Sequence, residues 1–158
     1  MINLDFQAEF EADNLPDFEQ LNVWAQTALK DLKDNADLSV VIVGPEESQS
    51  LNLEFRGKDK PTNVLSFPFE MPEELIGLDD DMANLLGDLI ICAPVVEREA
   101  KEQNKPLEHH WAHMVVHGCL HLLGYDHIKD DEADIMENLE RDILKRLDIP
   151  DPYLITDE

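Results

Sequence analysis

The sequence predicts an α/β protein (α+β-like) with a single domain, in which a small mixed sheet of about four strands packs with about five helices. Three observations predict this class. The 158 residues are enough for one domain with a sizeable core. Strand and helix signals mix along the chain without strict alternation, and no repeat or low-complexity segment interrupts them. We expect the domain at residues 1–150 and a tail at residues 151–158 that frays.

Four segments have the pattern of strands. Residues 2–6 alternate apolar and polar side chains, as in a half-buried strand, and residues 39–43 are β-branched. Residues 63–70 form a third strand, which Pro68 places at an edge or an end of the sheet because proline cannot donate to a ladder. Residues 85–93 are almost continuously apolar, which predicts a strand buried on both faces.

The helices are expected where apolar residues recur at helical spacing. Pro45 suits the first turn of one helix, and Pro94 ends the strand that precedes another. Residues 71–83 are rich in proline and aspartate, which predicts an exposed loop. The five helices are expected at about residues 17–33, 46–55, 95–104, 107–123 and 131–147.

The composition fits a cytoplasmic protein without a membrane partner. Hydrophobic residues make up 43% of the chain, a usual value for a globular protein. No apolar run approaches the roughly 18 residues of a membrane span, and the first residues lack the pattern of a secretory signal. Cys92 and Cys119 alone make no disulfide framework, so we expect a reducing compartment.

The chain is strongly acidic, with 36 acidic and 12 basic residues and a net charge of −24. Taken alone, this charge argues against nucleic acid as a partner, because a polyanion normally binds a basic surface. Arg56, Lys58 and Lys60 nevertheless form a compact basic spot. An acidic protein of this kind needs one local positive groove, or a partner for docking, to bind RNA.

Residues 117–127 are the most informative segment. His117 and His121 are four residues apart, so on a helix they lie one above the other and can converge on one ion. Gly124 can adopt the left-handed conformation that ends a helix, and the turn could bring in His127 as a third ligand. Three protein ligands leave a tetrahedral ion one open position, which suits a catalytic metal rather than a closed structural site.

The same spacing occurs in the zinc-peptidase signature His-Glu-x-x-His-x-x-Gly-x-x-His, with one difference. Gly118 stands where that signature has its general-base glutamate. The sequence therefore predicts a hydrolytic metal site, but not an ordinary zinc peptidase.

Several neighbours of this motif have more than one possible role. His113 shares the helix stripe and could orient a ligand or help to admit substrate, whereas Cys119 lies about 200° around the helix and should point into the core. Asp88 and Asp126 could each orient a ligand imidazole, or cap a strand end or a turn. The remaining two histidines of the helix are expected at the surface or in packing: His109 and His110.

Arg56 is the candidate basic residue of the site. Its planar guanidinium matches phosphate oxygens and could stabilise charge on a phosphoryl transition state. An arginine at a helix C-terminus also interacts favourably with the helix dipole without any function. The sequence pattern leaves both interpretations open.

Three segments, residues 55–68, 86–92 and 117–127, resemble the bacterial YbeY family, and the similarity covers roughly residues 20–147. The resemblance implies a single-strand-specific metallo-endoribonuclease that acts in maturation of the 3′ end of small-subunit ribosomal RNA and in ribosome quality control. It implies one Zn²⁺ ion or another divalent transition metal per chain, with His117, His121 and His127 as ligands. Arg56 and His117 are then the catalytic residues. Single-stranded RNA is the implied substrate, and ribosomal proteins or an assembly GTPase are candidate partners.

Two routes of cleavage stay open: attack by a metal-activated water, or attack by the ribose 2′-OH with the metal as Lewis acid. Two rival functions also stay open. One is a zinc hydrolase of other substrates such as peptides. The other is a non-catalytic ribosome-assembly factor whose metal is structural.

Overall fold

The computed structural model describes residues 2–12, 14–32, 35–68, 85–125 and 129–151. These residues form four strands and five helices, and the predicted class of one small α/β domain on a mixed sheet is confirmed. In chain order the elements are β1 (Ile2–Ala8), α1 (Phe18–Leu29), β2 (Ala36–Val43), α2 (Pro45–Arg56), β3 (Val64–Pro68), β4 (Leu85–Cys92), α3 (Ala93–Glu102), α4 (Leu107–Leu122) and α5 (Asp130–Arg146).

The sheet has the strand order β1-β2-β4-β3. β1, β2 and β4 run parallel, whereas β3 runs antiparallel to β4 and forms an edge of the sheet. Pro68 is the last residue of β3, so the prediction of an edge position for this strand is confirmed. An edge strand has a neighbouring strand on one side only. The candidate site lies beside this edge strand.

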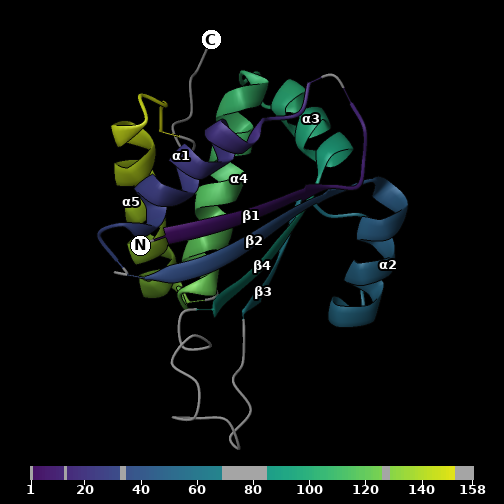
Figure 1. The fold of residues 1–158 in the computed structure, drawn as a ribbon, viewed down its shortest axis with the longest axis horizontal. Helices are drawn as coiled ribbons and strands as arrows, with labels where there is room; N and C mark the ends of the chain where they lie inside the picture. Colours follow the sequence, from purple (N-terminus) through teal and green to yellow (C-terminus); the bar gives the residue numbers. More distant parts are fainter. Residues whose placement is uncertain (1, 13, 33–34, 69–84, 126–128, 152–158) are drawn as a thin grey trace, which may run out of the picture.

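Helices α1 and α4 lie against one face of the sheet and α5 packs on both of them, whereas α2 lies on the other side, near the ends of β2 and β4 (Figure 1). α4 is the central helix, because it contacts α1, α3, α5, β3 and β4, and most of its residues are buried. Val115 and Leu120 are fully buried there, and burial of such a side chain stabilises the fold by about 1.5–3 kcal/mol. A rigid central helix can position side chains accurately.

The other face of the sheet is only partly covered. Asp88 is exposed and Leu85 is 39% exposed, so the prediction that residues 85–93 are buried on both faces is wrong for the first half of β4. Only the second half is covered on this side, where Cys92 and Val43 belong to a second small core. An apolar run predicted a fully buried strand, but α2 is too short to cover its whole length.

Two helix boundaries differ from the predicted ones for local reasons. α1 begins with a capping box between Asp17 and Gln20, and it ends at Leu29, before the predicted residue 33. There the chain tightens, because the N–H of Leu32 donates to the carbonyl of Leu29, three residues back, at 2.9 Å. α3 begins one residue before Pro94, so the proline lies in the first turn, where its missing N–H costs nothing.

Some predictions fall outside the described residues, namely the loop at residues 71–83 and the tail from residue 152 onward. Asp151 is the last described residue, and it pairs with Arg141 of α5 at 3.1 Å. Within the described ranges, none of the helices combines the length and the apolar composition needed to cross a membrane.

Candidate metal centre

Two histidines of α4 face each other across a short gap. The Nε2 atoms of His117 and His121 are 3.1 Å apart, and both side chains are partly exposed. Two nitrogen ligands that each lie about 2.0–2.1 Å from a tetrahedral zinc ion are themselves roughly 3.3 Å apart. The pair therefore has the spacing and the access that two ligands of one cation require.

A buried carboxylate from α5 orients the first of these histidines. The side chain of Glu140 is fully buried, with Oε1 2.5 Å from Nδ1 of His117 and Oε2 3.0 Å from Nε2 of His113. Burial raises the pKa of Glu140, but the hydrogen bonds and charges of His113 and His117 lower it to about 2, so the carboxyl is ionised at neutral pH. An ionised carboxylate only accepts hydrogen bonds. His117 therefore carries a proton on Nδ1, which leaves its Nε2 lone pair for a metal.

A second grouping of donors also exists. Ligand atoms of His113, His117 and Glu140 lie within 4.8 Å of one another, close enough to hold a cation. Burial lowers the pKa of His113 and outweighs its hydrogen bond to Glu140, so this imidazole favours the neutral form. The Nε2 pair of His117 and His121 is the better candidate, because both residues are partly exposed and line the same cavity as Arg56, whereas Glu140 is fully buried.

The chain turns sharply after α4, as the glycine spacing predicts. Gly124 has a φ of 102°, the left-handed region that favours glycine, and the N–H of Tyr125 donates to the carbonyl of Leu120 at 3.1 Å. The predicted helix end at Gly124 is confirmed. His127 and Asp126 lie outside the described residues, so the third ligand stays a prediction.

The histidine pair opens into a cavity of about 360 Å³ between α4, β3 and the end of α2. Arg56 lines this cavity as the last residue of α2, and Gly57 ends the helix in the left-handed conformation with a φ of 71°. Arg56 therefore lies in the same cavity as His117 and His121, although the two parts of the chain are far apart in sequence. The other residues of the lining come from β3 and the loop before it: Asn63, Val64, Ser66 and Pro68.

Position 118, which follows His117, has no room for a side chain. A Cβ on Gly118 would lie 2.6 Å from Cδ2 of Leu89, a fully buried residue of β4. Position 118 therefore faces the sheet, where α4 packs closely on β4, and not the cavity. The glutamate that zinc peptidases have at this position does not fit here.

Comparison with known proteins agrees with this architecture. The family model described as Endoribonuclease YbeY matches residues 6–148. The chain belongs to the YbeY family. The family predicted from the three motifs is confirmed, and membership makes the chain a relative of endoribonucleases, whose substrate is RNA. A similar solved structure is that of TM1509 from Thermotoga maritima, described as VT1, a NESGC target protein. It is 26% identical, with a TM-score of 0.57, and the match covers 96% of this chain and 99% of that chain.

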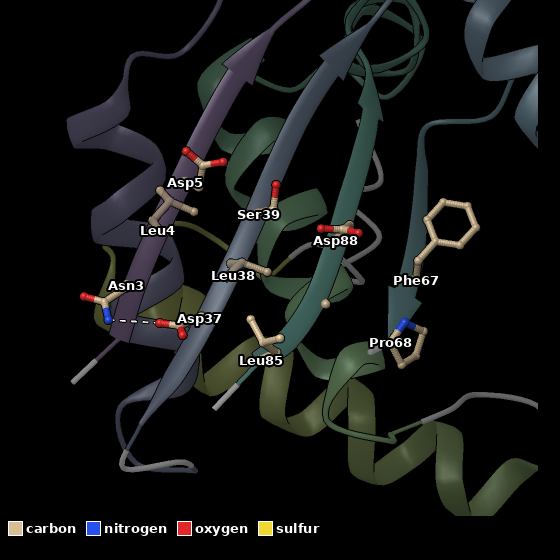
Figure 2. A pocket seen from close by; sticks show the side chains of 11 residues that line it. Asn3, Leu4, Asp5, Asp37, Leu38, Ser39, Phe67, Pro68, Leu85 and Asp88 are labelled. Atoms are coloured by element: carbon tan, nitrogen blue, oxygen red, sulfur yellow. Dashed lines mark hydrogen bonds between the residues drawn. The ribbon is translucent and has the colours of Figure 1, made fainter. Parts of the chain in front are cut away.

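Asp88, for which the sequence left two roles open, does not lie at the site. Asp88 lines a different cavity of about 600 Å³ on the open face of the sheet, together with Asp5 and with Asp37, which accepts a hydrogen bond from Asn3 at 2.9 Å (Figure 2). Asp88 follows strand alternation onto the face opposite Leu89, which packs on α4. It cannot orient a ligand imidazole of this YbeY-family site, although the sequence allowed that role.

The remaining histidines and the cysteine of α4 have structural surroundings. His110 is 2% exposed, with its Nε2 3.0 Å from Oε1 of Glu99 on α3, which agrees with the expected packing role. His109 lines a separate cavity near the start of α4. Cys119 is fully buried, as predicted, and burial raises its pKa to about 12, so the thiol is not a metal-binding thiolate at neutral pH.

The sequence analysis missed Glu140. On α5 this residue lies on the buried stripe with Met136, Ile143 and Leu144. A carboxylate on an apolar stripe is a usable signal, because burying a charge is costly unless the charge is paired. Its partners could not be deduced, because the contact between α5 and α4 exists only in the folded chain.

Proposed function

We propose that the protein is a metal-dependent endoribonuclease that cuts single-stranded RNA, with small-subunit ribosomal RNA as its substrate in 3′-end maturation and ribosome quality control. Family membership supports the general class of reaction. The main observation behind the site assignment is the 3.1 Å approach of the Nε2 atoms of His117 and His121 in the cavity that Arg56 also lines.

His117, His121 and His127 would hold one Zn²⁺ ion, or another divalent transition metal, because imidazole is a common ligand of these metals. When bound, the metal supplies an activated water or a Lewis acid for a phosphate oxygen. The chain's own residues orient the metal ligands and bind the substrate. Glu140 holds His117 in the tautomer that can ligate, and the guanidinium of Arg56 stabilises the negative charge that develops on the phosphate.

The close packing at Gly118 disfavours the rival interpretation as a peptidase, because this position cannot supply the general base of the zinc-peptidase signature. The attacking oxygen is then either a water or the ribose 2′-OH of the substrate. The product ends distinguish the two routes, since only attack by the 2′-OH produces a 2′,3′-cyclic phosphate.

The net charge of −24 supports a role for basic partners in bringing the enzyme to its substrate. Ribosomal proteins, which are basic, or an assembly GTPase would dock on the acidic surface in the cytoplasm. Arg56, Lys58 and Lys60 would then contact the RNA itself.

The test is cleavage of a single-stranded RNA, with metal content measured on the same samples. Arg56→Ala should lower the rate by about 10²–10³-fold, the range for losing one stabiliser of transition-state charge, and should keep the metal. His117→Ala should lose both metal and cleavage. Arg98→Ala and His109→Ala are matched controls, because Arg98 is exposed on α3 and His109 lines another cavity.

Equal cutting by wild type, Arg56→Ala and His117→Ala would reject the proposed function and indicate a contaminating nuclease. Metal-loaded wild type that cuts no RNA, together with unfolding of His117→Ala, would instead support an assembly factor with a structural metal.

A further inference from the structure

An exposed aromatic residue, Phe55, precedes Arg56 of the candidate site on α2. Phe55 is 59% exposed, the highest value among the large apolar side chains in the described part of the chain. Its ring packs edge to face against Phe67 of β3, with centroids 5.0 Å apart and an interplanar angle of 69°. This contact holds Phe55 in place and leaves much of the ring in solvent. A ring that is both exposed and held in place by a second ring presents a flat apolar surface to a ligand.

The two rings of the pair come from elements that also line the cavity, α2 and β3. Phe55 immediately precedes Arg56 on α2, so their Cα atoms are about 3.8 Å apart. Phe67 lies between Ser66 and Pro68, which both line the cavity, and strand alternation turns its ring to the other side of β3. Figure 2 shows the Phe67 ring pointing away from β4, beyond the edge of the sheet. The Phe67 ring therefore lies on the opposite side of the edge strand β3 from the cavity that Arg56 lines.

The charges at the end of α2, beside Phe55, favour a polyanion. Arg56, Lys58 and Lys60 are all exposed at the end of α2 and in the loop that follows. The acidic residues of this stretch are Glu54 and Asp59, and Asp59 accepts a hydrogen bond from the side chain of Gln49 at 2.8 Å. Asp88 lies next to Phe67 on the neighbouring strand β4, on the side of the pair away from Arg56. In a chain with a net charge of −24, three cations beside two acidic residues form a local positive spot.

We propose that Phe55, supported by Phe67, is a stacking platform for a base of single-stranded RNA whose phosphate is held at Arg56. This inference rests on the proposed function and adds a specificity determinant to it. Aromatic rings beside cationic groups are the usual means of binding single-stranded nucleic acid without sequence preference. A base inside a duplex is already stacked on its neighbours and is not available to Phe55, so the platform selects single strands.

The test measures RNA binding without cleavage, by fluorescence anisotropy of a labelled single-stranded oligonucleotide in the presence of a metal chelator. Phe55→Leu keeps an apolar side chain against Phe67 but removes the flat ring, and we expect the dissociation constant to rise about tenfold. Phe18→Leu is the matched control, because Phe18 is 46% exposed at the start of α1. It should bind as wild type does. An oligonucleotide of the same length and charge that lacks bases should bind wild type and Phe55→Leu equally.

Each outcome separates the platform from the proposed function. Wild type that binds single-stranded RNA no better than an uncharged polymer would overturn the platform, whereas the proposed function is tested separately by the cleavage assay. Wild type that binds the RNA while Phe55→Leu binds it equally well would overturn the platform alone. A loss in Phe55→Leu that is as large for the oligonucleotide without bases would also overturn it, because the ring would then act on Arg56 and not on a base.

Discussion

Replacing Glu140 with glutamine tests whether this carboxylate orients His117 for metal binding. The carboxylate faces two ring nitrogens, Nδ1 of His117 at 2.5 Å and Nε2 of His113 at 3.0 Å. Glutamine has nearly the same shape, but its amide offers one acceptor oxygen and one donor nitrogen. One imidazole must therefore change its tautomer. Where His117 changes, its Nε2 gains the proton and can no longer bind a metal.

We expect the metal dissociation constant of Glu140→Gln to rise about 10- to 100-fold, the range found when the hydrogen-bond partner of a metal-binding histidine is removed. This range corresponds to about 1.4–2.7 kcal/mol of binding free energy. Competition with a chromophoric chelator measures the constant. Glu99→Gln is the matched control, because Glu99 makes a similar contact with His110 on the same helix, at 3.0 Å, without touching His117.

Unchanged metal affinity in Glu140→Gln would refute this reasoning. Equal weakening in Glu99→Gln would also refute it, because the effect would then come from general loosening around α4. Nitrogen chemical shifts of His117 give a readout that is independent of metal binding. In the metal-free variant they should show an increased population of the tautomer with the proton on Nε2.

Three further predictions follow from burial. Gly118→Ala should destabilise the protein by about 1–3 kcal/mol, because its Cβ would lie 2.6 Å from Leu89; an unchanged melting temperature would contradict this. Cys92 and Cys119 should resist thiol reagents until the protein unfolds, because burial raises both pKa values, and labelling of the native protein would show otherwise. The metal-free protein should lose stability as the pH falls from 4.5 toward about 2, because the pKa of Glu140 is lowered in the folded state and its stabilisation exists only above that window. The loss is about 3 kcal/mol in urea unfolding, and Glu140→Gln should lack this component.

The parts of the site that depend on local helix geometry could be predicted from sequence. The spacing of His117 and His121 and the turn at Gly124 follow from the period of one helix and the backbone freedom of one residue. The roles of Glu140 and Asp88 could not be predicted in the same way, because they depend on which face of a distant element meets α4. Asp88 belongs to one of the three family motifs, at residues 86–92, but it lies on the face of the sheet opposite the site.

The acidic character of the chain limits how RNA can be held. Among the described residues, Arg56 lines the cavity and the exposed Lys58 and Lys60 follow it in the chain, and each phosphate contact weakens as salt rises. Asp5, Asp37 and Asp88 make the middle of the open face unfavourable for a polyanion, whereas Phe67 lies on the edge strand β3, toward the basic end of α2. Stacking on Phe55 involves no net charge and is therefore screened less by salt than the phosphate contacts are. In a protein with a net charge of −24, a stacking contact beside one small basic spot increases the affinity for RNA without requiring further positive charge.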